Sequence, residues 1–172
     1  LYMGSFMPYK NVETMIRGMA ELPEMTLHLL SRITPERRAE LDALAPAGSN
    51  IVFHNGVTDA EYEELLARTT ALVSLSKAEG YGLPLVEAMS HGTPVIASDI
   101  PIFREVGGDA VSYVAPDSPS AFAAAVRELE EPELWKERSS RSVQRAAEFS
   151  WDASARSLLA AAEEVVALRK RR

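Results

Sequence analysis

Two acidic residues flank a glycine-rich segment near the middle of the chain. Glu79 stands directly before Gly80-Tyr81-Gly82, and seven residues separate it from Glu87, so both acids are expected to face one pocket. Glycines let a backbone approach a ligand closely, and a helix that begins at Pro84 would turn free N–H groups toward a phosphate. A carboxylate accepts hydrogen bonds from vicinal hydroxyls. The spacing of the two acids fits a site for a phosphorylated sugar. It fits at least as well a simpler interpretation, in which Glu79 is an exposed loop acid and Glu87 stabilises the helix dipole.

The loop from Gly4 to Asn11 supplies a cation. Lys10 stands where the next helix is expected to begin. A lysine at a helix N-terminus opposes the dipole unless an anion lies nearby, and a diphosphate would be such an anion. A lysine with its stem on the protein and its head in water is the simpler alternative.

Short apolar runs alternate with helical periodicity along the whole chain. Strands are expected at 1–4, 25–30, 50–54, 70–75, 93–98 and 110–114. Helices are expected at 11–22, from Thr34, from Thr58, and at 84–91, 101–106, 118–130, 132–148 and 151–169. The alternation predicts an α/β fold, a Rossmann-like parallel sheet of about six strands with helices on both faces. Such sheets bind ligands beyond the carboxyl ends of their strands.

The composition argues against several classes of function. The 172 residues suit one domain, and a formal net charge of −7 argues against a surface that binds nucleic acid. Cysteine is absent, which excludes disulfides and thiolate metal sites. His28, His54 and His91 lie far apart and lack the spacing of metal ligands. No nucleophile elbow, phosphate loop or dinucleotide fingerprint occurs.

The two ends of the chain suggest its context. Leu1 to Ser5 reads as a strand that runs into a turn, without a leader or an initiator Met, so we expect a chain cut from a longer one at a domain boundary. The basic run 169–172 is expected to be a solvated tail, with contact to an anionic membrane surface as the alternative. No apolar run is long enough to span a bilayer.

Several segments together resemble one family of enzymes. Residues 79–87, continued by Ala88-Met89-Ser90-His91-Gly92-Thr93-Pro94-Val95-Ile96, resemble the signature of the retaining family 4 glycosyltransferases of group 1 type. Residues 4–11 resemble the first strand and diphosphate loop of that family, 53–59 its third-strand exit, and 149–152 the start of its closing helix. The resemblance covers nearly the whole chain.

This resemblance implies the C-terminal, donor-binding half of a GT-B fold, which is built from two Rossmann-like domains. Residues 1–172 would form a single nucleotide-sugar-binding domain closed by the helix 151–169, and the N-terminal acceptor domain would be absent from the chain. The implied activity is retaining hexosyl transfer to a glycan or a lipid-linked acceptor, without a metal ion or another cofactor. Residues 4–11 and 98–106 look most like mannosyltransferases, which implies GDP-mannose as the donor.

The resemblance also implies roles for the matched residues. Lys10 would contact the donor diphosphate, Glu79 would hold the hydroxyls of the donor sugar as the acid of the catalytic site, and Glu87 would bind the ribose. Where the family usually has an arginine this chain has Ser5, so Lys10 would carry more of the diphosphate, and Arg104 is a candidate substitute. The backbone of Gly80, Tyr81, Gly82 and Leu83 would line the sugar and the phosphates, and Gly4 would belong to the diphosphate loop. Val57 would lie against the nucleobase, and Arg32 would stack on or near it.

Three alternatives remain open from the sequence. A UDP-sugar could replace GDP-mannose, Glu79 and Glu87 could form the acid/base pair of a glycoside hydrolase, or the chain could be a noncatalytic nucleotide-binding module. The expected partners are the nucleotide sugar and the N-terminal domain of the same protein, with no nucleic acid. The expected location is the cytoplasm, with peripheral contact at the inner face of the membrane.

Overall fold

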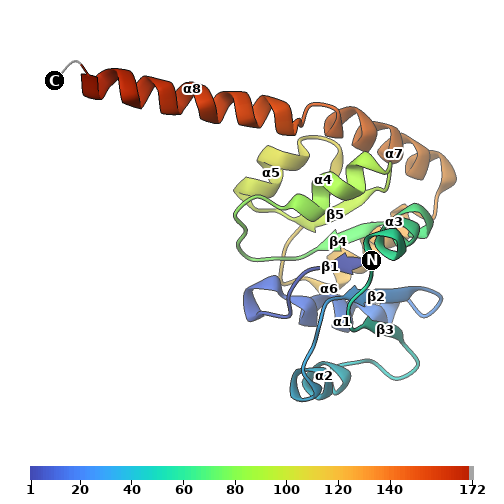
Figure 1. Cartoon of the computed structure of the whole chain (residues 1–172). Helices are drawn as coiled ribbons and strands as arrows, with labels where there is room; N and C mark the ends of the chain where they lie inside the picture. Colours follow the sequence, from blue (N-terminus) through green and yellow to red (C-terminus); the bar gives the residue numbers. More distant parts are fainter. Residues whose placement is uncertain (171–172) are drawn as a thin grey trace.

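A parallel α/β architecture is seen in the structure, a computed structural model that describes residues 1–170 (Figure 1). Its six strands are β1 (Tyr2–Met3), β2 (Thr26–Leu30), β3 (Asn50–His54), β4 (Leu72–Ser74), β5 (Val95–Ser98) and β6 (Val111–Val114). All strand pairs are parallel, and they form two three-stranded sheets in the orders β1-β2-β3 and β4-β5-β6. The six parallel strands confirm the prediction, whereas their division into two sheets was not expected.

The two sheets meet edge to edge at the start of the chain. The Leu1 carbonyl accepts a hydrogen bond from the Val73 N–H (2.8 Å), and the Leu1 nitrogen donates to the Ala71 carbonyl (2.9 Å). These bonds come from Leu1 because β1 has only two residues, Tyr2–Met3, which pair with β2. The carboxyl ends of β1 and β4 therefore lie side by side.

Helices follow the strands and cover both faces (Figure 1). Thr34 caps its helix by accepting from the Arg37 N–H (3.2 Å), and Thr58 and Glu61 form the predicted capping box. The α-helices are α1 (Val12–Gly18), α2 (Pro35–Asp42), α3 (Asp59–Arg68), α4 (Leu83–Ser90), α5 (Pro101–Gly107), α6 (Pro119–Glu128), α7 (Pro132–Ala146) and α8 (Trp151–Lys170). Two 3-10 turns are η1 (Pro8–Lys10) and η2 (Met19–Glu21).

Two expectations from the sequence are wrong. The helix expected at 11–22 ends at Gly18 and continues only as the 3-10 turn η2 to Glu21, because the chain must turn before Pro23. The histidines His28 and His54 are not far apart: the Nδ1 and Nε2 atoms lie 2.9 Å apart and the rings stack at 5.2 Å. Leu30 on β2 pairs with His54 on β3. His28 is two residues before Leu30, so its side chain points to the same face of the sheet as that of His54.

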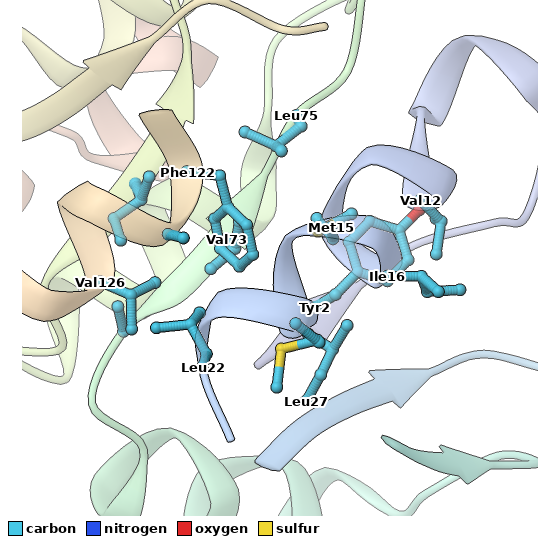
Figure 2. Close-up of a cluster of buried hydrophobic side chains, with 14 of the residues drawn as sticks. Tyr2, Val12, Met15, Ile16, Leu22, Leu27, Val73, Leu75, Phe122 and Val126 are labelled. Carbon is cyan, nitrogen blue, oxygen red and sulfur yellow. The ribbon is translucent and has the colours of Figure 1, made fainter. Parts of the chain in front are cut away.

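Two hydrophobic clusters fill the space between strands and helices. The first packs α1 and α6 against one face of the strands, and Figure 2 shows Met15 and Phe122 at its centre. The second packs α4 and α5 against the other face. Leu72 belongs to the second cluster and its neighbour Val73 to the first, since successive residues of a strand point to opposite faces. Burial on both faces explains why β4 is apolar without alternation.

Helix α8 projects away from the rest of the molecule (Figure 1). Its side chains 151–166 are all exposed, Trp151 by 80%, and they include an apolar set of Leu158, Leu159, Val165 and Val166. No helix within residues 1–170 is long and apolar enough to cross a membrane. Of the basic run at the C-terminus, residues 171 and 172 lie outside the described residues.

Candidate functional site

The loop after β1 is fastened to the loop after β4. Asn11 stands in the left-handed conformation (φ 55°), and its amide donates to the carbonyls of Leu75 (3.0 Å) and Pro116 (2.6 Å). The Lys77 N–H donates to the Tyr9 carbonyl (2.8 Å). These bonds fix η1, so that Lys10 is held at the point where the two sheets meet.

Lys10 and Glu79 face each other between these loops. The Lys10 Nζ lies 2.5 Å from the Glu79 Oε1, and the Ser76 hydroxyl donates to the same oxygen at 2.8 Å. The two charged side chains are only 18% and 14% exposed. They line a cavity of about 300 Å³, which we call the Lys10–Glu79 cavity, together with Tyr2, Met3, Gly4, Ser74, Tyr81, Gly82, Leu83, Pro84 and Leu85.

Two glycines shape this cavity. A Cβ on Gly4 would lie 2.9 Å from the Tyr2 hydroxyl, and a Cβ on Gly82 would lie 2.8 Å from the Phe103 ring. Gly82 also has a φ of 93°, which L side chains rarely adopt, so the chain can turn there into α4. As predicted, the helix begins at this turn with a proline in its first turn, and its N-terminus with Leu83 and Pro84 borders the cavity. Gly80 is exposed, and a Cβ there would meet nothing within 4 Å.

Glu87 lies on the outer surface of α4, beside a second cavity. Its Oε2 accepts a hydrogen bond from the Tyr62 hydroxyl on α3 (3.1 Å). The pKa of Tyr62 is raised, first by burial and then by the Glu87 charge, so this hydroxyl keeps its proton at neutral pH. The second cavity, of about 550 Å³, shares two residues with the first and is lined by Tyr81, Leu83, Val86, Glu87, Ser90, Ala146, Phe149, Ser150, Trp151 and Ser154. The two acids therefore line adjoining cavities and not the single pocket that the sequence suggested.

The remaining predicted residues lie around these cavities. Val57, after β3, is half-buried against the second hydrophobic cluster, and the exposed Arg32, after β2, lies near Gly56. Ser5 is exposed, and its carbonyl accepts from the Tyr2 hydroxyl (2.5 Å). None of these three side chains lines either cavity.

Arg104, the candidate substitute for a cation at position 5, is paired with another residue and does not line the Lys10–Glu79 cavity. Its guanidinium binds both oxygens of Asp99, at 2.7 and 2.8 Å, and lies over the Tyr113 ring at 4.1 Å. Lys10 is therefore the one cation among the described residues that line the Lys10–Glu79 cavity. Within residues 1–170, no group of histidine or carboxylate side chains is arranged to hold a metal ion.

Sequence reasoning missed three polar residues of the site: Asn11, Tyr62 and Ser76. Ser76 precedes Glu79 by three residues, so a hydroxyl in reach of the acid was visible in the sequence. Asn11 directly follows Lys10, and its left-handed conformation depends on the path of the loop, which the sequence does not reveal. Tyr62 gave no signal, because its contact with Glu87 depends on how α3 packs beside α4.

Known proteins resemble this chain over most of its length. The family model described as glycosyl transferases group 1 matches residues 1–149. The O-antigen chain mannosyltransferase B of Escherichia coli is 31% identical over 160 residues, which are 88% of this chain and 42% of that protein. The MMP alpha-(1->4)-mannosyltransferase of Mycolicibacterium hassiacum is 30% identical over 170 residues, 93% of this chain and 41% of that protein. The chain thus spans less than half the length of these relatives.

Solved structures resemble the whole chain. Sucrose-phosphate synthase from Thermosynechococcus elongatus superposes with a TM-score of 0.83 at 26% sequence identity, over 97% of this chain and 45% of that one. The structural neighbours are GT-B glycosyltransferases, so the predicted fold class is confirmed.

Proposed function

Because this chain belongs to the group 1 family of glycosyl transferases, we propose that it is the donor-binding domain of a retaining mannosyltransferase that uses GDP-mannose. The observation that carries the proposal is the Lys10–Glu79 cavity, in which a cation and an acid face each other across 2.5 Å. A diphosphate needs a cation and N–H donors, and a sugar needs an acceptor for its hydroxyls. Groups of both kinds border this one cavity.

In the proposed complex the diphosphate lies between Lys10 and the N-terminus of α4. It takes over the ion pair that Lys10 makes with Glu79, and the carboxylate then accepts hydrogen bonds from the donor sugar. The backbone from Gly80 to Leu83 lines the sugar and the phosphates. Glu87 binds the ribose in the adjoining cavity, and Val57 lies toward the nucleobase with Arg32 beside it.

The proposed reaction retains the configuration of the donor sugar. The bond from the anomeric carbon to the diphosphate oxygen breaks, the acceptor oxygen bonds the same carbon on the same face, and the acceptor proton passes to the departing phosphate. The protein contributes positioning and electrostatic stabilisation of the diphosphate by Lys10 and the helix N-terminus. Glu79 is a sugar-binding acid in this scheme and not a general base, and no metal ion is required.

The relatives support mannose as the sugar, since both sequence relatives described above are mannosyltransferases. A UDP-sugar is the alternative donor. Residues 1–172 would act with an N-terminal acceptor domain of the same protein, which is consistent with the 42% of the Escherichia coli relative that the chain spans. A glycan or lipid-linked acceptor and peripheral contact with the inner face of the membrane complete the proposal.

Ligand-observed NMR of this chain with GDP, UDP, GDP-mannose, free mannose and a free oligosaccharide tests the proposal. We expect signals from GDP and GDP-mannose and none from free mannose. If UDP bound more strongly than GDP, the donor would be a UDP-sugar instead of GDP-mannose. Binding of a free oligosaccharide without nucleotide would favour a hydrolase. Silence with every nucleotide would refute the donor site. We also expect no sugar transfer by this chain alone, since the acceptor side is proposed to lie in another domain.

A further inference from the structure

Among the described residues, the side chains that hold Glu79 all reach one of its two oxygens. The Ser76 hydroxyl (2.8 Å) and the Lys10 ammonium (2.5 Å) both reach Oε1. Among the described residues, no donor reaches Oε2. One oxygen is thus fixed by the protein, and the other is left for a ligand that shares the cavity.

Ser76 is anchored in the core. It is fully buried, two residues after the end of β4. A carboxylate only accepts hydrogen bonds, so the single hydroxyl hydrogen of Ser76 is committed to Glu79. The Ser74 hydroxyl, 3.4 Å away and also at the cavity, must then donate to Ser76. This hydroxyl chain comes from the last residue of β4 and the buried segment directly after it, whereas Lys10 comes from the separate loop after β1.

We infer that Ser76 is a positioning residue, which holds the Glu79 carboxylate so that Oε2 faces the donor sugar. The inference rests on the proposed function, because it takes Glu79 as the acid that binds the sugar. In the proposed donor complex the Lys10 ammonium binds the diphosphate in place of Glu79. Ser76 is then the remaining donor to Glu79 among the described residues, and the direction of Oε2 depends on it.

The dissociation constants of GDP and GDP-mannose, measured by titration calorimetry, test this inference in Ser76→Ala. GDP has no sugar, so its affinity should be nearly unchanged. GDP-mannose should bind about tenfold more weakly, the usual scale of a hydrogen bond to a charged group. An unchanged ratio of the two constants overturns the inference while the proposed function stands. Absence of GDP binding to the unaltered chain overturns the proposed function, and this inference with it.

Ser98→Ala is the matched control for a lost buried hydroxyl. Ser98 is equally buried on the neighbouring strand β5, bonds the Ser74 carbonyl (3.5 Å), and does not line the cavity. We expect this variant to keep the ratio of the two constants. If Ser98→Ala weakened GDP-mannose relative to GDP as much as Ser76→Ala does, the cause would be general loosening of the core, and the inference would be overturned.

A double variant shows whether Ser76 acts through Glu79. In Glu79→Gln the sugar-binding carboxylate is already lost, so adding Ser76→Ala should leave the ratio of GDP to GDP-mannose affinity as it is in Glu79→Gln. A further loss of about tenfold in the double variant would mean that Ser76 acts by another route, contrary to the inference.

Discussion

The positive charge of the Lys10–Glu79 cavity rests on one side chain. Lys10 is the one lysine or arginine among the described lining residues, and Arg104 is bound to Asp99 instead. A charge-assisted hydrogen bond contributes about 1.5–3 kcal/mol. We therefore predict that Lys10→Met weakens GDP binding, measured by calorimetry, roughly 10- to 100-fold. Lys10→Arg should recover part of the affinity.

Lys77 offers the control for charge alone. It belongs to the connection between β4 and α4 that also carries Glu79, is half exposed, pairs with Asp117 at 2.6 Å, and does not line the cavity. Lys77→Met removes the same charge from the chain and should change GDP affinity by less than about twofold, because exposed charges are screened by salt. Equal losses in the two variants would contradict a direct contact by Lys10.

Tyr62 holds one oxygen of Glu87, just as Ser76 holds one oxygen of Glu79. Its hydroxyl occupies Glu87 Oε2 at 3.1 Å, and we expect the other oxygen to bind the ribose. Tyr62→Phe removes one hydrogen bond and should weaken GDP binding about three- to tenfold. The difference in affinity between GDP and 2′-deoxy-GDP should also shrink, because a loosened Glu87 distinguishes the ribose hydroxyl less well. Calorimetry with both nucleotides measures the two effects.

Tyr113→Phe is the control for the loss of a tyrosine hydroxyl. The Tyr113 hydroxyl bonds the carbonyls of Phe103 and Gly108, at 2.9 Å each, and lines neither cavity. This variant should lower the melting temperature and keep the ratio of GDP to 2′-deoxy-GDP affinity. If Tyr62→Phe also kept that ratio, its assigned role would be wrong.

At the scale of elements, the sequence predicts what is local. The caps at Thr34 and Thr58 depend on residues three positions away, and both helices begin where those caps stand. The end of α1 at Gly18 was missed, because the helix stops where the chain must turn toward β2. The pair of His28 and His54 was missed because the register of β2 against β3 is set by tertiary packing.

That histidine pair gives the β2–β3 sheet a pH dependence. The pKa of His28 is lowered from 6.5, first by burial and then by His54. The unfolded chain therefore takes up a proton at His28 at a higher pH than the folded chain does. The contribution of His28 to the free energy of unfolding is therefore fully present above pH 6.5 and is lost as the pH decreases toward the folded pKa. We predict that His28→Gln reduces this fall, measured by urea unfolding at about pH 7.5 and about pH 5.5.

His91 provides the comparison, because it is exposed at the end of α4. His91→Gln should leave the difference in unfolding free energy between the two pH values unchanged. If His28→Gln and His91→Gln behaved alike, the pH dependence would come from groups other than the half-buried pair of His28 and His54.

At the scale of the whole molecule, the site lies where the order of the strands reverses. β1 is the edge strand of the first sheet and β4 is the edge strand of the second. The two edges lie side by side and are joined by the hydrogen bonds of Leu1. Ligands of open α/β sheets bind at such a switch point. The sequence predicted both loops of the site from glycine, lysine and acid patterns. It could not predict that Lys10 and Glu79, 69 residues apart, touch, because that depends on which strands become neighbours.

Helix α8 is the part of the molecule with least tertiary support. Its side chains 151–166 are exposed, and an isolated helix of this length is only marginally stable in water. We predict that its amide hydrogens exchange much faster than those of α7 (Pro132–Ala146), which packs against α4. Hydrogen exchange of this chain, read by mass spectrometry on peptides from the two helices, measures the difference, and equal exchange would contradict it.

The same measurement distinguishes what covers the apolar side chains of α8, namely Leu158, Leu159, Val165 and Val166. If another domain of the protein packs on them, exchange in α8 should slow in a full-length protein that contains this chain, and Leu159→Glu should restore fast exchange. If a membrane covers them, vesicles of anionic lipid should slow exchange in this chain alone. We expect the first result, since the acidic and basic residues of α8 are equal in number, three of each, and leave no net positive charge to bind an anionic surface.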